Sequence, residues 1–234
     1  MNKLQFAVLA SGSTGNAVYV QPGNDTGFLL DCGLSKPVLK KRLKIIGKTI
    51  NDVSGAFITH SHGDHNNLTA SRSLPWNRRF YSYRTGTDYF NDKCKITHFK
   101  LAHGDCPCYG FRVDYNDLSI AYLVDTEYIP EESLQYLFDL DAIIIESSYR
   151  ERMLKESGGT VYGNVGDRHL SNEQATCVLG CINSNRLKYV IMAHISSRLN
   201  TKAFAYNAGK EGAPQAEVIV AEQDKPIKMI TLMS

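Results

Sequence analysis

The chain has 234 residues, of which 43% are hydrophobic, enough to bury one large core or two fused half-units. Its formal net charge of +2 is not the bulk excess of positive charge that marks a general nucleic-acid binder. No window approaches 18 apolar residues and the start lacks a signal-peptide pattern, so we expect no membrane span and no membrane partner. The six cysteines form no Cys-x-x-Cys pair, which favours free thiols in a cytoplasmic protein over a disulfide framework.

Patterns typical of strands and helices alternate along the first half. We predict strands at residues 4–10 and 17–20 around a Gly/Ser-rich turn at 11–16, which lacks the lysine and the following helix of a P-loop. That turn is either a tight hairpin or a loop near a functional site. The other predicted elements are a strand at 27–31, an amphipathic helix at 36–47 closed by Gly47, a strand at 55–58, a helix from 68, a short strand near 80–81 and strands at 95–100, 109–115 and 118–124.

The second half repeats this scheme. The predicted elements are a helix at 130–138, a strand at 141–145, a polar stretch at 147–168, a helix from 171 to about 184, and strands at 187–192, 218–221 and 227–232. The capping box Ser171-Asn172-Glu173-Gln174 opens the second of these helices. Strands followed by helices in two similar halves favour an α/β fold of four layers, an αββα sandwich with helices outside two central sheets. Because no linker is rich in Pro, Gly or Ser, we expect residues 1–234 to form a single domain.

The most informative stretch is Thr59-His60-Ser61-His62-Gly63-Asp64-His65, between a predicted strand and a predicted helix. On an extended backbone His60 and His62 point the same way, whereas Asp64 and His65 can face a second point. The stretch therefore suits two neighbouring metal ions, with His60 and His62 on one and Asp64 and His65 on the other. Imidazole and carboxylate are donors for zinc, manganese or iron. A solvated polar loop is the alternative, which four such donors directly after an apolar strand disfavour.

Three further candidates lie where predicted strands end. His103, Asp125 and His194 each follow such a strand, and sites in layered α/β folds usually lie at strand ends. We therefore predict that they are metal ligands too. His98 lies inside a predicted strand, and we expect it to be structural.

Through residues 60–65, the sequence resembles the metallo-β-lactamase superfamily. More narrowly it is similar to the YycJ/WalJ group, through Leu9–Asn16, Asp31–Ser35, Ile145–Tyr149 with Met153 and Leu154, and Arg168–Asn172. His169-Leu170-Ser171 and His194–Arg198 are also similar to ribonuclease Z. The resemblance implies a metallo-β-lactamase sandwich that holds two divalent metal ions, zinc or manganese. It implies that one ion is bound by His60, His62 and His103, the other by Asp64, His65 and His194, and that Asp125 bridges them.

Two cations about 3.5–4 Å apart lower the pKa of a shared water and make hydroxide available near neutral pH, which suits attack on a phosphodiester. His169, at a predicted helix N-terminus, could protonate the leaving oxygen, and Glu146 could orient it by analogy with the family. The alternative for His169 is a neighbour of the helix cap. The predicted catalytic residues are thus Asp64, His169 and Glu146. The predicted substrate contacts are Ser171, Arg168 and Ser196.

The leading functional prediction is a metal-dependent phosphodiesterase, a single-strand nucleic-acid exonuclease, as the YycJ/WalJ resemblance implies. The alternative is a cyclic-nucleotide phosphodiesterase of the kind that phages use against Pycsar defence, which a compact chain would suit. A thioester, lactone or β-lactam hydrolase is disfavoured by His169-Leu170-Ser171, and a non-catalytic scaffold by the complete ligand set. No inserted domain of the β-CASP type and no Gly/Pro-rich arm for transfer RNA is evident. A homodimer is left open.

Overall fold

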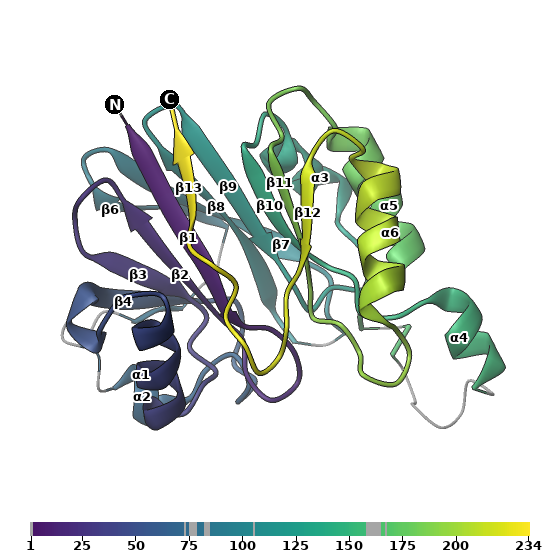
Figure 1. The fold of residues 1–234 in the computed structure, drawn as a ribbon, viewed down its shortest axis with the longest axis horizontal. Helices are drawn as coiled ribbons and strands as arrows, with labels where there is room; N and C mark the ends of the chain where they lie inside the picture. Colours follow the sequence, from purple (N-terminus) through teal and green to yellow (C-terminus); the bar gives the residue numbers. More distant parts are fainter. Residues whose placement is uncertain are drawn as a thin grey trace. The chain divides into compact units, whose positions relative to one another are not determined.

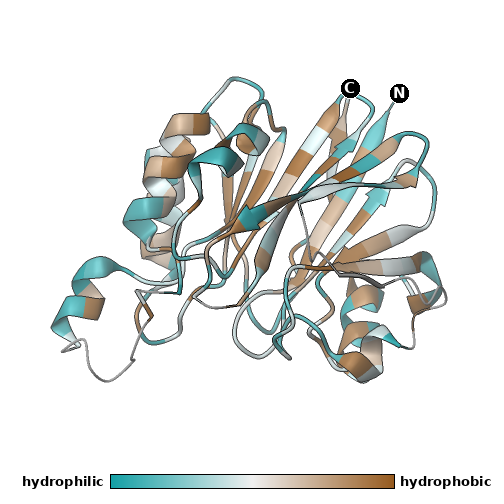
Figure 2. Ribbon diagram, turned by 180° about the vertical axis from the view of Figure 1, so that it is seen from behind, coloured by the Kyte–Doolittle hydropathy of each residue, from teal (hydrophilic) through white to brown (hydrophobic). Residues whose placement is uncertain are grey.

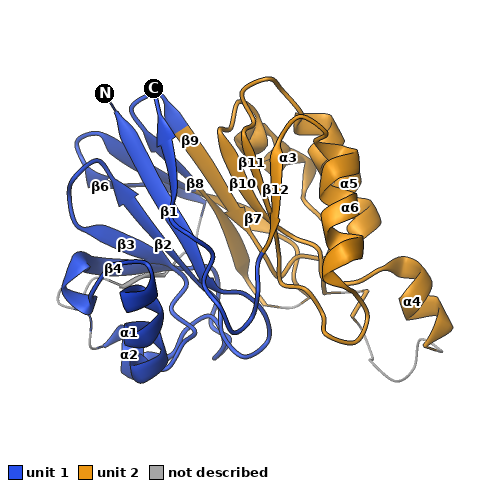
Figure 3. Cartoon of the chain, in the orientation of Figure 1, with its two compact units in different colours: residues 1–97, 113–118, 221–234 blue, residues 98–112, 119–220 orange. Residues whose placement is uncertain are grey.

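The computed structural model describes residues 2–72, 74, 79–81, 85–104, 106–157, 165–166 and 168–234. The chain divides into two compact units, which Figure 3 colours blue and orange. Unit 1 comprises residues 1–97, 113–118 and 221–234, and unit 2 comprises residues 98–112 and 119–220. That the whole chain is one domain stays a prediction.

Unit 1 contains a mixed six-stranded sheet with the strand order β13-β1-β2-β3-β4-β5 (Figure 1). Strand β1 pairs antiparallel with β2 and β13, β2 pairs antiparallel with β3, and β3, β4 and β5 are parallel. The elements of this unit are β1 (Lys3–Ala10), β2 (Ala17–Pro22), β3 (Gly27–Leu30), α1 (Lys36–Ile45), η1 (Ile50–Asp52), β4 (Val53–Ile58), α2 (Leu68–Ser71), β5 (Arg79–Tyr81), β6 (Gly86–Asn91) and β13 (Ile230–Met233).

The second sheet has seven strands in the order β12-β11-β10-β9-β8-β7-β6, and β9 to β12 are parallel. Strands β7 (Cys94–Leu101), β8 (Cys108–Tyr115) and β9 (Leu118–Leu123) contribute residues to both units. Unit 2 adds α3 (Glu131–Leu134), η2 (Gln135–Leu137), β10 (Ala142–Glu146), α4 (Glu151–Glu156), α5 (Asn172–Ile182), β11 (Tyr189–Ala193), α6 (Lys202–Gly212) and β12 (Glu217–Val220). Helices α5 and α6 pack on each other, and α6 also packs on β11 and β12.

Each unit has its own hydrophobic core. In unit 1, α1 buries Leu39 and Leu43 in a cluster with strand residues such as Leu29. In unit 2, Leu179 of α5 packs in a cluster with residues of β9, β10 and β11, such as Ile143. Figure 2 shows the hydrophobic residues gathered along the strands. The sheets are therefore fixed by apolar burial, and their polar strand ends are held in place as a consequence.

Most predicted elements are confirmed, including the capping box at Ser171 and the turn at Gly47, whose φ is +73°. Two mixed sheets with helices confirm the α/β class. The prediction of one helix at 130–138 was wrong in extent, because α3 covers a single turn and η2 continues as a 3-10 turn. Strand β6 and helices α4 and α6 were not predicted. Among the described residues, no helix is long and apolar enough to cross a membrane.

Candidate metal centre

The parallel strands β3 and β4 of unit 1 end at the same edge of their sheet, and polar residues follow both. Asp31 comes directly after β3, and Thr59 and His60 come directly after β4. Asp31 has a φ of +59°, a conformation that few residues other than glycine adopt. The Asp31 carboxylate accepts hydrogen bonds from the amide (2.8 Å) and the hydroxyl (3.0 Å) of Thr59. Parallel pairing therefore brings a buried carboxylate to the start of the histidine-rich loop.

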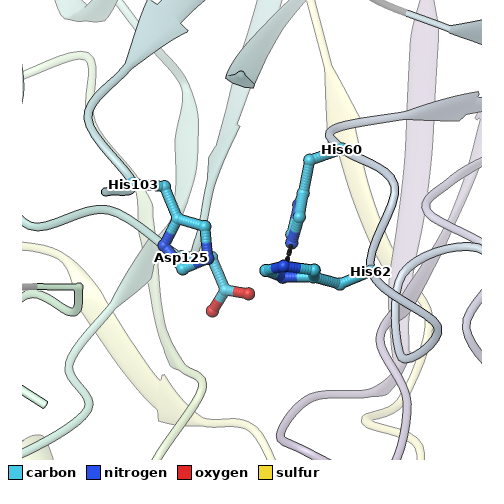
Figure 4. Close-up of side chains that lie close together, drawn as sticks. All are labelled: His60, His62, His103 and Asp125. Atoms are coloured by element: carbon cyan, nitrogen blue, oxygen red, sulfur yellow. Dashed lines mark hydrogen bonds between the residues drawn. The ribbon is translucent and has the colours of Figure 1, made fainter. Parts of the chain in front are cut away.

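Three imidazoles of this loop gather within unit 1. The Nε2 atom of His60 lies 2.8 Å from the Nδ1 atom of His62, the contact dashed in Figure 4. The ring centroids of His60 and His65 are 4.2 Å apart. His60 and His65 are buried, whereas His62 is exposed. Two ring nitrogens at this separation can serve as ligands of one ion, as the sequence predicted for His60 and His62.

His65 is oriented by the carboxylate that also holds Thr59. Its Nδ1 atom lies 2.7 Å from Oδ2 of Asp31, and both side chains are fully buried. A proton on Nδ1 donates to Asp31 and leaves the lone pair of Nε2 for a ligand bond, as metal-binding histidines commonly do. The Nε2 atom lies 3.5 Å from a carboxylate oxygen of Asp64. Asp64 and His65 thus present an oxygen and a nitrogen to one point.

The Gly/Ser-rich turn at 11–16 supports the same loop. The Asn16 side-chain nitrogen lies 2.9 Å from Nε2 of His65 and, with Nδ1 protonated, donates to the lone pair that an ion would take. The backbone N–H of Asn16 donates to the Asp64 carbonyl at 2.7 Å. A Cβ atom at Gly33 would overlap that carbonyl, so only glycine permits this close approach. The sequence left open whether the turn is a hairpin or a loop at the site, and it is both a β1–β2 connection and a loop at the site.

In unit 2 the candidate residues lie at the ends of three adjacent parallel strands. Asp125 follows β9, Glu146 ends β10 and His194 follows β11. The strands align so that Glu146 pairs with Ala193, the residue before His194. Asp125 and His194 both have a φ of +54°, which turns the chain sharply at the sheet edge. Residues far apart in sequence are thus brought together by strand register alone.

Glu146 is fully buried and uses both carboxylate oxygens. Its Oε1 atom lies 2.7 Å from Nδ1 of His169 and 3.0 Å from Nδ1 of His194. Its Oε2 atom accepts hydrogen bonds from the amides of Thr126 (2.8 Å) and Leu170 (3.3 Å). A carboxylate offers about four lone-pair positions, so this one is fully engaged in orienting its neighbours.

The histidines beside Glu146 titrate differently from a free imidazole. Burial lowers the pKa of His169, but the charge of Glu146 and hydrogen bonds to Asp125 and Glu146 outweigh burial and raise it to about 10. Burial also lowers the pKa of His194, but the charge of Asp125 and the hydrogen bond to Glu146 outweigh burial, so this pKa is raised. Burial raises the pKa of Glu146, but the charges and hydrogen bonds of His169 and His194 outweigh burial, so this pKa is lowered. Unit 2 therefore holds an ionised Glu146 beside protonated imidazole in the metal-free protein.

His103 follows β7, and its ring centroid lies 5.9 Å from that of His169. Its Nδ1 atom lies 3.0 Å from the Arg168 carbonyl oxygen, which accepts a hydrogen bond from Nδ1–H, so Nε2 is the nitrogen that can bind an ion. Burial lowers the pKa of His103, which keeps the imidazole neutral, as a metal ligand must be. Figure 4 draws His103 with Asp125; the resemblance implies that His103 binds one ion and that Asp125 bridges the two.

The three predicted substrate contacts have clear local roles. Ser171 is buried and its hydroxyl accepts from the Gln174 amide as the cap of α5 (3.1 Å). The Ser196 hydroxyl accepts from the amides of Arg198 and Leu199. The Arg168 side chain is exposed, while its carbonyl holds His103. Contact of these residues with substrate stays a prediction.

The donor sets of both units fit divalent metal ions. Unit 1 offers three imidazoles and the Asp64 carboxylate. Unit 2 offers His103, Asp125 and His194, and the ligand atoms of Asp125 and His194 lie within 4.8 Å of each other and of those of Glu146 and His169. Nitrogen and carboxylate oxygen donors suit zinc or manganese rather than a purely oxygen-seeking ion. His98, by contrast, is buried in β7 with its ring edge-on to Phe111, outside both sets.

The residues that support the predicted ligands were not predicted from the sequence. Asp31, Thr59 and Asn16 each contact a predicted ligand or its neighbour, yet none was predicted as a site residue. Asp31 is the last residue of a predicted strand, and its position at a strand end is a signal that could have found it. Asn16 could not be found in this way, because only the folded turn brings its side chain to His65.

Known proteins are similar to this chain in sequence. Residues 10–67 match the family model of the metallo-beta-lactamase superfamily. The chain is 27% identical over 231 residues to exodeoxyribonuclease YycJ of Bacillus anthracis, covering 86% of each chain. It is 23% identical over 245 residues to exodeoxyribonuclease WalJ of Streptococcus pneumoniae, covering 92% of this chain and 90% of WalJ.

Solved structures agree on the fold. The short form of human tRNase Z superposes with a TM-score of 0.66 at 16% identity, covering 95% of this chain and 98% of the human protein. All six cysteines are free, as expected. With the histidine and aspartate clusters above, these similarities confirm the resemblance drawn from the motifs. The chain is a metal-dependent hydrolase with the metallo-β-lactamase fold, similar to the YycJ/WalJ proteins.

Proposed function

We propose that this hydrolase is a phosphodiesterase that acts on nucleic acid, as an exonuclease on single strands. Two relatives that match most of the chain are named exodeoxyribonucleases, and a structural neighbour is a tRNase Z. Each of these names describes a protein that acts on a nucleic acid. The support from the chain itself is the arrangement of Glu146 and His169.

We further propose that the two donor sets join in one centre with two divalent ions, zinc or manganese. His60, His62 and His103 would hold one ion, Asp64, His65 and His194 the other, and Asp125 would bridge them. When bound, such ions polarise a phosphoryl oxygen and lower the pKa of water. Glu146 is left out of this set, because its four lone-pair positions are already engaged.

The observation that carries the proposal is the His169–Glu146 contact of 2.7 Å. It fixes the proton of Nδ1 toward Glu146, so Nε2 is the nitrogen that can donate to a leaving group. His169 is partly exposed and lies three residues before the first residue of α5, whose N-terminal amides favour an anion. A protonated imidazole beside a phosphate site can neutralise the leaving oxygen of a nucleotide, a poor leaving group that benefits from a general acid.

The test is a panel of end-labelled single-stranded DNA, single-stranded RNA and cyclic mononucleotides, each with Mn²⁺ or Zn²⁺. The expected result is stepwise shortening of a single strand, with mononucleotides as products. Turnover of cyclic mononucleotides alone would replace the exonuclease with the cyclic-nucleotide alternative. Turnover of a thioester or lactone, with every phosphodiester inert, would contradict both.

The two-ion arrangement has a separate test. A structure determined with Zn²⁺ or Mn²⁺ should show ligand bonds of about 2 Å from His103 and His194 to the ions that the residues of the 60–65 loop bind. If no such bond forms from either histidine, the ligand assignment is wrong. A cytoplasmic location and a homodimer stay predictions.

A further inference from the structure

A pocket of about 620 Å³ opens on unit 2 beside His103. One wall is formed by described residues between Lys100 and Tyr109, at the end of β7 and after it. The other wall is the segment that precedes and begins α3, with residues between Tyr128 and Glu132. His103, a proposed metal ligand, is one of the lining residues, so the pocket borders the proposed metal site. The volume is within the range of sites for small organic molecules.

Backbone and side-chain hydrogen bonds tie the two walls together. The Glu127 amide donates to the Ala102 carbonyl at 2.7 Å. The Thr126 hydroxyl accepts from the Ala102 amide (3.2 Å) and donates to the Tyr128 carbonyl (2.6 Å). Ser133 of α3 donates its hydroxyl hydrogen to the Lys100 carbonyl at 2.7 Å. The pocket is therefore preformed, and a ligand would not have to order its walls.

The lining combines aromatic faces with carboxylates. Tyr109 is buried, whereas 53% of the surface of Tyr128 is exposed. The side chains of Glu131 and Glu132 are exposed. Among the described lining residues, Lys100 is the one lysine or arginine. An aromatic ring offers a surface on which any base can stack. Carboxylates accept hydrogen bonds from amino groups and repel a phosphate, so the pocket suits a base rather than a second phosphate.

We propose that this pocket binds the nucleobase of the nucleotide whose phosphodiester is cleaved. The base would stack on Tyr128, and the carboxylates of Glu131 and Glu132 would accept from its amino or ring N–H groups. The proposal rests on the proposed phosphodiesterase function, which it deepens by giving the substrate a base-binding subsite. A polymer and a mononucleotide both carry such a base, whereas a nitrophenyl diester does not.

The experiment pairs a change in the protein with a change in the substrate. Single-stranded DNA oligonucleotides are prepared with either a normal or an abasic terminal nucleotide, and KM and kcat are measured for the wild type and for Tyr128→Ala. Tyr128→Ala should raise KM for the normal oligonucleotide by about 10-fold, within the range for a base stacked on an aromatic ring. On the abasic oligonucleotide the variant and the wild type should have the same KM.

Two variants serve as controls. Tyr128→Phe keeps the ring and should keep the wild-type KM. Tyr206→Ala removes a tyrosine that is 44% exposed on α6, away from the pocket lining, and should change KM for neither substrate. An equal loss on the normal and the abasic oligonucleotide for Tyr128→Ala would overturn the subsite, and so would no loss on either.

A binding measurement separates this proposal from the proposed function. Calorimetry compares deoxycytidine monophosphate with deoxyribose 5-phosphate on wild type and Tyr128→Ala. Tighter binding of the nucleotide that disappears in the variant supports the subsite, even if no nucleic acid is turned over. Turnover of oligonucleotides with equal binding of both probes would overturn the subsite and leave the phosphodiesterase proposal standing.

Discussion

The two units supply their metal donors in different ways. In unit 1 the donors His60, His62, Asp64 and His65 come from one loop after a single strand. In unit 2 the donors His103, Asp125 and His194 follow three different strands, and long stretches of chain separate them. One set depends on loop conformation, and the other depends on sheet register.

Each set is backed by one buried carboxylate, but the two carboxylates support different groups. Asp31 accepts from His65 and from Thr59. Glu146 accepts from His169, from His194 and from two backbone amides. Asp31 therefore orients one predicted ligand, His65, whereas Glu146 couples a predicted ligand, His194, to the predicted acid, His169.

The largest expected effect comes from removing a donor of the loop set. Asp64→Ala should reduce turnover to background while leaving the fold intact, because Asp64 lies on a loop and its side chain is 27% exposed. Turnover of single-stranded DNA, bound metal by elemental analysis and the thermal midpoint check this together. We expect loss of bound metal with an unchanged midpoint for the metal-free proteins. A large fall in that midpoint would mean that the loop carries part of the core.

Removing the proposed acid of unit 2 should have an effect that depends on the substrate. His169→Ala should slow a natural nucleotide diester by about 10²–10⁴, the usual contribution of acid–base catalysis. A diester with a nitrophenolate leaving group needs little proton donation and should be far less affected. Metal content should not change, because His169 is not assigned as a ligand.

Other outcomes for His169→Ala would redraw the comparison. Equal losses on both diesters would indicate phosphate positioning in place of proton donation. Loss of bound metal would make His169 a ligand and add a donor to the unit 2 set. Unchanged rates on both would leave it as a neighbour of the α5 cap.

The two supporting carboxylates can be compared directly by neutral isosteres. Asp31→Asn and Glu146→Gln should each weaken metal binding, within the 10–100-fold range typical of residues that orient ligands. Each new amide turns an N–H group toward an imidazole that needs an acceptor. Glu146→Gln should be near the upper end and Asp31→Asn near the lower, because Glu146 accepts from two histidines and Asp31 from one. Metal affinity by competition with a chelator gives the order. Equal affinities for the two variants would remove the distinction between the units.

The same comparison explains what the sequence could predict. The contiguous motif of unit 1 was evident because a strand pattern leads directly into four metal donors. The strand-end residues Asp125 and His194 were predicted because parallel strands place their carboxyl ends at one edge. Asp31 shares this strand-end position and could have been found by it, but its partner His65 is known only from the folded structure.

Helix α6 was missed for a different physical reason. The residues that it buries are Ala205, Ala208, Gly209 and Gly212. Small residues give a weak apolar periodicity, although they are what lets α6 approach α5 and the sheet closely. A Cβ at Gly209 would lie 2.8 Å from Val218 of β12 and 3.0 Å from the Met192 sulfur of β11. Such packing is visible only once the partner elements are in place.

The smallest expected effect tests how far the unit 2 donors depend on this packing. Gly209→Ala should lower the free energy of unfolding by about 1–3 kcal/mol, the usual cost of overpacking a core, because the added methyl group presses on Val218 and Met192. Gly180→Ala on α5 is the matched control, since a Cβ there meets nothing within 4 Å. It should raise the free energy of unfolding by about 0.5–1 kcal/mol through helix propensity.

Denaturant titration gives both values, and turnover is measured on the same samples. Met192 lies two residues before His194, so strain at Gly209 reaches the sheet edge that carries the donor. We expect the Gly209→Ala protein to lose stability with less than about a 3-fold change in turnover, because the register of β10 and β11 is held by five aligned residue pairs. A loss of turnover much larger than this, at a temperature where the variant is folded, would show that packing strain displaces the unit 2 donors. The two units would then differ only in whether their donors are contiguous in the sequence, and not in how firmly the donors are held.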